Sequence, residues 1–139
     1  MYNGAMKAIT YLGLDYGHVR IGVARGDSQL RLARPLQTLE KVASPADAIQ
    51  ALMHTAGAAE LVVGLPRSLD GEDTIQTAAA RAFADHIATT LGCPVHLMDE
   101  AGTSSVAEDG LKAAGKPYTK GDIDQAAAAL ILQDYLDSL

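Results

Sequence analysis

The residues of this chain that could do chemistry are four acidic side chains placed beside apolar segments. Asp15 ends one apolar stretch, the adjacent Asp99 and Glu100 follow another, and Asp124 stands near the start of the last helical segment. Converging carboxylates repel one another unless a cation binds between them, and Mg²⁺ prefers a few carboxylates together with water and phosphate oxygens. Two such ions activate water and stabilise the leaving oxygen of a phosphodiester. The pattern predicts a carboxylate–metal site of the kind that cuts nucleic acid.

Helical periodicity predicts that the Asp124 side chain points inward. The residues that follow it on the same helical face are mostly apolar: Ala127, Ala128, Ile131 and Tyr135. Asp122 is about 200° away from Asp124 around a helix, so the two cannot share a face. With Gln125 three residues later, Asp122 instead resembles a helix-capping residue. Asp124 is therefore the preferred ligand of this segment.

The other acidic residues leave alternatives open. Asp99 and Glu100 are neighbours on a predicted strand and face opposite sides, so at most one of them readily joins the site. Asp15 could instead form the turn before Gly17, and Asp99 could serve a turn or a helix N-terminus. The favoured catalytic and metal-binding set is Asp15, Glu100 and Asp124, with Asp99 as a further candidate ligand.

Weaker candidates for phosphate contacts lie in nearby loops and helix starts. Loops that follow strands often carry function, and helix N-termini attract phosphate. The candidate nucleic-acid-binding residues are Arg20, Arg67, Ser68, Arg81, Thr103 and Ser104. Arg20 could instead cover a sheet edge, and Thr103 or Ser104 could simply cap a helix. The four histidines show no spacing typical of a zinc site.

Three strands, followed by helices and strands in alternation, must position these residues. The predicted strands cover residues 8–15, 19–25, about 30–40, 60–65 and 94–98. The predicted helices run from Ser44 to Gly57, over 73–91, from Thr103 or Ser104 to Gly115, and over 122–137. Ser44 is expected to cap the first helix, with Asp47 completing a capping-box-like pattern. The order β-β-β-α-β-α-β-α-α predicts an α/β fold with a mixed five-stranded sheet and helices on both faces. Its central first strand would place Asp15 at the crevice where ligands bind.

Length and composition favour one domain over residues 1–139. The chain is 48% hydrophobic, with no Trp and one Phe, so its core must be built of Ala, Val, Leu and Ile. No apolar run approaches the roughly 20 residues that span a bilayer, and residues 1–6 lack the pattern of a secretion signal. A single cysteine, Cys93, excludes an internal disulfide and fits a reducing compartment. We therefore expect a cytoplasmic protein that does not bind membranes.

Charge is unevenly distributed along the chain. The formal net charge is −6, which argues against nonspecific binding to nucleic acid. Residues 1–41, however, hold six basic side chains against three acidic ones. One end of the chain could therefore face a polyanion, although a mixed solvated surface would give the same counts.

Five stretches in order along nearly the whole chain resemble the YqgF family, also called RuvX. They are GLDYGHVRIGVA (13–24), PLQTL (35–39), VVGLPRSLDG (62–71), DEAGTS (99–104) and IDQAAAALILQDYL (123–136). Members of this family are similar to Holliday junction resolvases, have the ribonuclease H fold and are described as nucleases for pre-16S rRNA. Each stretch is modest alone, and together they are specific.

The resemblance implies a metal-dependent phosphodiesterase centre formed by Asp15, Glu100 with Asp99 beside it, and Asp124. It implies one or two Mg²⁺ or Mn²⁺ ions and a role in ribosomal RNA maturation. The implied partners are structured RNA such as pre-16S rRNA, or branched DNA, and ribosomal particles. A resolvase of four-way DNA junctions would use the same site but make two symmetric cuts, which requires a dimer. The expected state is a monomer or a weak homodimer.

Departures from the family pattern keep other hypotheses open. Ala101 and Gly102 stand where the family usually has Arg and a larger apolar residue, His18 stands where Thr is common, and the loop 116–120 has few basic residues. The acidic residues are kept, whereas the residues expected to hold phosphate are fewer. A non-catalytic RNA- or ribosome-binding factor is therefore a third hypothesis. The glycines around Asp15 also resemble the phosphate loop of the actin, hexokinase and Hsp70 group, which needs two such domains.

Overall fold

The computed structural model describes residues 7–40 and 44–139 and contains a five-stranded mixed sheet. Its elements are β1 (Thr10–Tyr16), β2 (Arg20–Asp27), β3 (Arg34–Glu40), α1 (Pro45–Ala56), β4 (Glu60–Pro66), α2 (Ile75–Leu91), β5 (Val95–Glu100), α3 (Thr103–Ala114) and α4 (Lys120–Asp137). The strand order is β3-β2-β1-β4-β5, in which β2 is antiparallel to β1 and β3, and β4 is parallel to β1 and β5. The predicted order of elements and the central first strand are confirmed. The segment 1–6 and Lys41, which entered the signal and charge arguments, lie outside the described residues.

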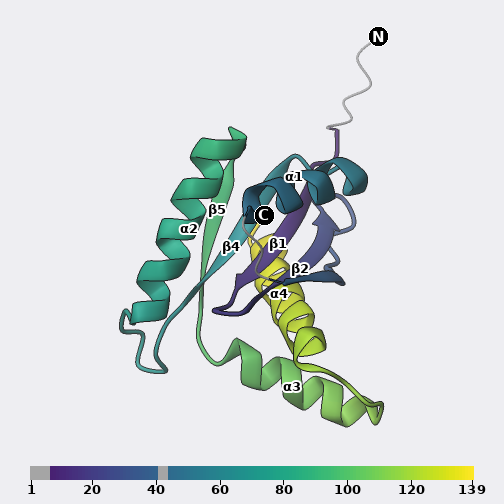
Figure 1. The fold of residues 1–139 in the computed structure, drawn as a ribbon. Coiled ribbons are helices and arrows are strands. Elements are labelled where there is room, and N and C mark those ends of the chain that lie inside the picture. Colours follow the sequence, from purple (N-terminus) through teal and green to yellow (C-terminus); the bar gives the residue numbers. More distant parts are fainter. Residues whose placement is uncertain (1–6, 41–43) are drawn as a thin grey trace.

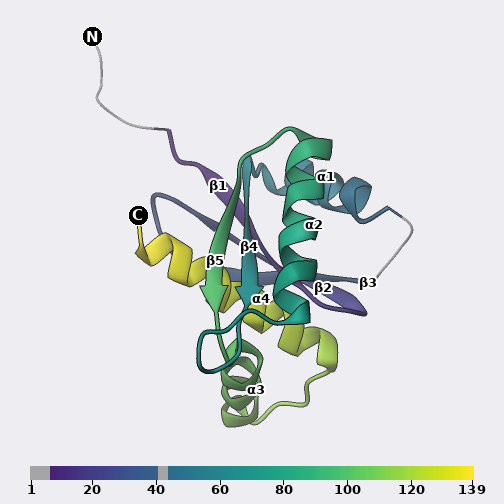
Figure 2. The ribbon, with the colours of Figure 1, turned by 90° about the vertical axis from the view of Figure 1, so that its left-hand side faces the viewer.

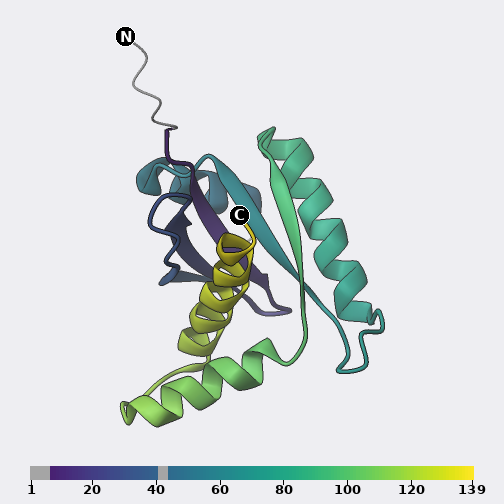
Figure 3. The same ribbon diagram turned by 180° about the vertical axis from the view of Figure 1, so that it is seen from behind.

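Helices cover both faces of the sheet, as predicted. Helices α1 and α2 lie on one face and α4 crosses the other, with α3 extending beyond the end of the sheet (Figures 1, 2 and 3). Strand β1 alternates between the two layers because successive side chains on a strand point to opposite sides. Leu12 and Leu14 pack in the core beneath α1 and α2, whereas Tyr11 packs against α4. Asp15 shares the parity of Tyr11 and therefore faces α4.

Glycines on three adjacent strands let α4 lie very close to the sheet. A Cβ added at Gly13 would lie 2.7 Å from the Cβ of Leu132, and one at Gly64 would lie 2.5 Å from Cδ1 of Ile131. At Gly22 a Cβ would collide with the main-chain oxygen of Asp124. Only glycine permits this separation between helix and sheet, and it brings the first turn of α4 down to the end of β1.

The third strand begins later than predicted because a tight turn occupies its expected start. The Asp27 carboxylate accepts hydrogen bonds from the main-chain N–H groups of residues 29 and 30, each at 2.8 Å. Arg31 adopts φ 55°, and the Gln133 side chain of α4 bonds both its carbonyl and the N–H of Ala33. The segment before Arg34 is thus fixed as a loop by contacts that lie about a hundred residues apart in the chain.

Two predicted side-chain caps are not formed. Ser44 is the N-cap residue of α1, as predicted, but its hydroxyl donates to the Asp47 carboxylate at 2.8 Å instead of capping a main-chain N–H. Helix α3 has no side-chain cap, because its N-cap is Gly102 in a left-handed conformation. Thr103 and Ser104 are the first residues of that helix and do not cap it.

Helix α4 begins two residues earlier than predicted. Its N-cap is Thr119, whose hydroxyl accepts from the N–H of Asp122 while the Asp122 carboxylate accepts from the N–H of Thr119. Asp122 therefore serves the helix start from its third position, and Gln125 instead donates to the hydroxyl of Thr38 on β3. Within the described residues, no helix combines the length and apolarity needed to cross a membrane.

Candidate active site

Asp15 lies near the end of the central strand, paired in register with Gly22. The turn that follows is closed by the N–H of Gly17 on the carbonyl of Arg20, so the turn-forming alternative for Asp15 is not observed. Burial raises the pKa of Asp15 to about 7, and repulsion from Glu100 and Asp124 adds to the effect. Among the described residues nothing donates a hydrogen bond to its carboxylate.

Glu100 ends β5 and points to the same end of the sheet. Burial raises the pKa of Glu100, and a hydrogen bond from the Thr103 side chain partly offsets this increase. Thr103 thus serves the carboxylate at the start of α3, although it does not cap the helix. Strand geometry turns Asp99, the adjacent residue, to the other side, as predicted.

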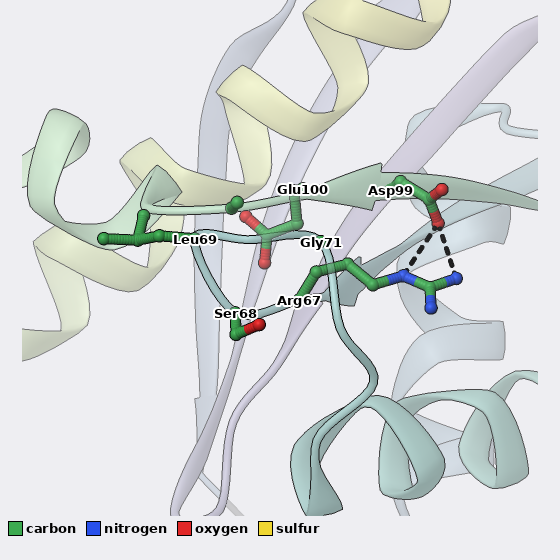
Figure 4. A pocket seen from close by; sticks show the side chains of 7 residues that line it. Arg67, Ser68, Leu69, Gly71, Asp99 and Glu100 are labelled. Carbon is green, nitrogen blue, oxygen red and sulfur yellow. Dashed lines mark hydrogen bonds and ion pairs between the residues drawn. The ribbon is translucent and has the colours of Figure 1, made fainter.

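Asp99 is exposed and engaged with an arginine. Its carboxylate accepts from Nε and Nη2 of Arg67 at 3.3 and 3.1 Å, and Figure 4 shows it directed away from Glu100 toward that guanidinium. Arg67 also forms an ion pair with Asp73. Because two carboxylates already bind this guanidinium, Arg67 joins β4, β5 and the loop before α2. Its predicted contact with phosphate would have to compete with both acids.

Ser68 organises the loop that follows β4. Its hydroxyl donates to the carboxylate of Asp70 and accepts from the main-chain N–H of Glu72. This loop and the end of β5 enclose a hollow of about 450 Å³. Its lining residues are Arg67, Ser68, Leu69, Gly71, Asp99, Glu100 and Ala101 (Figure 4). Glu100 is therefore reachable from this side.

Asp124 lies in the first turn of α4, where its carboxylate is held by Arg20. The Arg20 Nε donates to Oδ2 of Asp124 at 2.7 Å, with side chains 25% and 20% exposed respectively. Arg20 was predicted to contact nucleic acid or cover an edge, and in the structure it neutralises one of the three predicted metal ligands. The pairing spans 104 positions of sequence, and no local pattern could have shown it.

A second hollow, of about 290 Å³, lies beside Asp124. It is lined by Arg20, Ser104, Ser105, Glu108, Lys120, Ile123 and Asp124. Sequence reasoning missed Lys120 and Ser105 as candidates. Lys120 stands four residues before Asp124, and residues at this spacing share a helix face. That spacing could have indicated Lys120 as a candidate only if α4 had been predicted to begin at residue 120.

Arg81 is not brought to this site. It lies on the exposed side of α2, forms no hydrogen bond or ion pair with the described residues, and lines neither hollow.

Thr103 lines a third hollow with Ala101, Val106, Leu130 and Asp134. The structure therefore gathers Asp15, Glu100, Asp124, Arg20 and the start of α3 around one end of the sheet.

The fit of a divalent cation depends on the carboxylates that face Asp15. In the described part of the chain no three His, Cys, Asp or Glu side chains are close enough to hold a metal ion as they stand. Nevertheless, Asp15 lacks a hydrogen-bond donor and experiences repulsion from Glu100 and Asp124. Carboxylate oxygens are the ligands that Mg²⁺ and Mn²⁺ prefer. The residue types and their charge fit such a cation, provided that Asp124 gives up its ion pair with Arg20.

The sequence of the chain matches a family model and curated proteins over most of its length. The RuvX family model, described as Holliday junction resolvase, matches residues 9–138. A protein of Chloroflexus aggregans named "Putative pre-16S rRNA nuclease" is 45% identical over 139 residues, covering 96% of each chain. One of the same name from Chloroflexus aurantiacus is 44% identical over 133 residues, covering 91% of this chain and 86% of its own length.

Solved structures agree on the fold. Thermus thermophilus RuvC in complex with a Holliday junction substrate superposes with a TM-score of 0.52 at 16% identity, covering 94% of each chain. This likeness confirms the predicted ribonuclease H-like fold, with its mixed five-stranded sheet and four helices. The family match and the identity to the curated relatives over most of their length confirm the resemblance found in the sequence. The chain belongs to the RuvX family of nucleases.

Proposed function

We propose that this chain is a divalent-cation-dependent endonuclease that cuts structured RNA during maturation of pre-16S rRNA in the cytoplasm. The names of the curated relatives support the substrate. Asp15, Glu100 and Asp124 are the proposed catalytic and metal-binding residues. We also propose that the described segments act as one nuclease domain.

One observation carries the proposal. Asp15 is a half-buried carboxylate on the central strand that has no hydrogen-bond donor and faces two further acids. Such an arrangement opposes folding, because desolvation and like charges both disfavour the ionised form. Ionisable side chains often have perturbed pKa values at functional sites, where they are kept although they do not stabilise the fold. A bound divalent cation would relieve the repulsion here.

The side chains of this chain have distinct proposed roles. When bound, the cation would activate water and stabilise the leaving oxygen of the phosphodiester. Asp15 would hold it from a rigid central strand, and Asp124 from a helix that the glycines fix against that strand. Glu100 would be held in orientation by Thr103.

A four-way DNA junction is the second candidate substrate. The description of the family model favours it, since that description is of a Holliday junction resolvase. The same three carboxylates would serve, but the two symmetric cuts of a junction require two copies of the site. Oligomeric state therefore separates the candidates as well as substrate does.

Side-by-side cleavage assays test both candidates. Labelled pre-16S rRNA fragments and a synthetic four-way DNA junction would be incubated with Mg²⁺, Mn²⁺ or EDTA. Asp15→Asn removes the central carboxylate, and Asp85→Asn, an exposed acid on α2, is the matched control. We expect cation-dependent cutting of RNA that is lost only with Asp15→Asn. Cutting of the junction alone would favour the second candidate, and cutting of neither by folded protein would favour a binding factor.

A further inference from the structure

The hollow beside Asp124 is polar, and its formal charges balance. Arg20 and Lys120 bring two positive charges to its lining, and Glu108 and Asp124 bring two negative ones. Ser104 adds an exposed hydroxyl at the start of α3. A neutral pocket whose Asp124 lies close enough to Asp15 to repel it would hold a phosphate weakly, because these carboxylates repel the phosphate as well. Phosphate binding here would therefore depend on which cationic group is paired with the Asp124 carboxylate.

The charged groups of this hollow differ in how they are engaged. Arg20 is bound to Asp124 at 2.7 Å, and Glu108 accepts a hydrogen bond from the hydroxyl of Tyr118 at 2.8 Å. Lys120 is exposed and forms no ion pair within the described residues. Arg20 is thus the one basic side chain of the lining that is already held by an acid.

We propose that this hollow binds a backbone phosphate of the nucleic acid, and that Arg20 is released to that phosphate when a divalent cation takes over Asp124. This inference rests on the proposed nuclease function. A cation neutralises the carboxylate that holds the guanidinium, and the lining then carries a net positive charge. A guanidinium presents a planar fork of donors that matches phosphate oxygens. Lys120 contributes its charge in either state.

The exchange makes the binding of cation and of nucleic acid cooperative. If the cation raises the affinity for nucleic acid by some factor, the nucleic acid raises the affinity for the cation by the same factor. Arg20 would contribute to that factor only in the presence of cation. This conditional contribution distinguishes an exchanged arginine from one that is simply a free surface charge.

Equilibrium binding measures the exchange without cleavage. Fluorescence anisotropy of a fluorescein-labelled RNA hairpin would be recorded in Ca²⁺ or in EDTA, at matched ionic strength because salt weakens phosphate contacts. We expect Arg20→Gln to lose about tenfold or more in affinity in Ca²⁺, as for one lost charged hydrogen bond, and little in EDTA. Lys120→Ala should lose affinity in both conditions. Lys112→Ala, an exposed lysine on α3 that lines neither hollow, should change nothing.

Calorimetric titration of Ca²⁺, and of Mn²⁺, into the protein without RNA gives a second readout. Arg20→Gln should bind the cation a few-fold more tightly than the unmodified chain, because the competing guanidinium is gone. Arg20→Lys keeps the charge without the planar fork, so it should retain part of the increase in RNA affinity that Ca²⁺ produces. It also serves as the second variant if Arg20→Gln does not fold.

Several outcomes would overturn the exchange. They are an equal loss of RNA affinity with and without Ca²⁺, no loss in either condition, or cation affinity that Arg20→Gln leaves unchanged or weakens. An enzyme that cuts RNA while showing any of these keeps the proposed function and loses the exchange. A protein that shows the cation-dependent effect of Arg20→Gln on RNA affinity but does not cut RNA would support the exchange and contradict the proposed nuclease function.

Discussion

Asparagine at position 15 would keep the shape of the aspartate and remove its charge. The unfolded chain releases the Asp15 proton near its ordinary pKa of 3.8, whereas the folded chain holds it to about pH 7. The folded state therefore binds more protons between these values, and the stability of the unmodified chain falls as pH rises through that window. About three pKa units correspond to roughly 4 kcal/mol. Asp15→Asn should escape that loss.

Urea denaturation in EDTA between pH 4 and pH 8.5 measures this effect. We expect the two proteins to have similar free energies of unfolding near pH 4. By pH 8, Asp15→Asn should be the more stable by up to about 4 kcal/mol, with an unchanged m-value. Asp85→Asn should run parallel to the unmodified chain at every pH. A stability difference that does not grow with pH, or an Asp15→Asn protein that is less stable at pH 8, would refute the account of Asp15.

Other changes test neighbouring parts of the same structure. Gly22→Ala places a Cβ against the main-chain oxygen of Asp124, so urea denaturation should show a loss of about 1–3 kcal/mol. Gly110→Ala meets nothing within 4 Å inside α3 and should gain up to about 1 kcal/mol; equal effects of the two would contradict the close approach. Thr103→Val removes the hydrogen bond that lowers the pKa of Glu100, so the acidic limb of the pH–rate profile should move to higher pH. An unmoved limb would show that Thr103 does not act through Glu100.

Adding Mn²⁺ should offset the loss of stability at high pH in the unmodified chain and not in Asp15→Asn. A ligand that binds the folded chain stabilises it in proportion to the logarithm of its concentration above Kd. At pH 8, millimolar Mn²⁺ should therefore raise the melting temperature of the unmodified chain more than that of Asp15→Asn. Equal shifts in differential scanning fluorimetry would argue against Asp15 as a ligand.

The order of elements was predictable because it depends on local pattern. The apolar run before Asp15 predicts a buried strand, and the apolar stripe after Asp124 predicts a helix face turned toward the sheet. Those two patterns predict where each carboxylate stands on its own element, and the structure shows that the two lie close together. Alternation along a strand likewise separates Glu100 from Asp99. The catalytic roles of these residues are still a prediction.

What the sequence could not show are contacts between distant residues. The hydrogen bond of Arg20 to Asp124, and the binding of the Arg67 guanidinium by two acids, depend on tertiary packing. The missing side-chain cap at Ser44 has a local cause instead, because its hydroxyl donates to the carboxylate of Asp47 three residues away and not to a main-chain group. The fate of a polar side chain is set by which partner comes nearest in three dimensions.

The glycines under α4 have a consequence for how this protein tolerates change. At Gly22 the main chain of Asp124 and Gln125 limits how closely helix and strand approach, whereas at Gly13 the nearest atom is the Cβ of Leu132. Substitutions of Ile131, whose side chain packs on Gly64 of β4, would alter stability and the spacing there, while the main-chain contact at Gly22 would keep Asp124 close to the end of β1. The stability of the core and the positions of the two carboxylates then depend on different contacts. Sequence drift in the helix could proceed without moving the carboxylates apart.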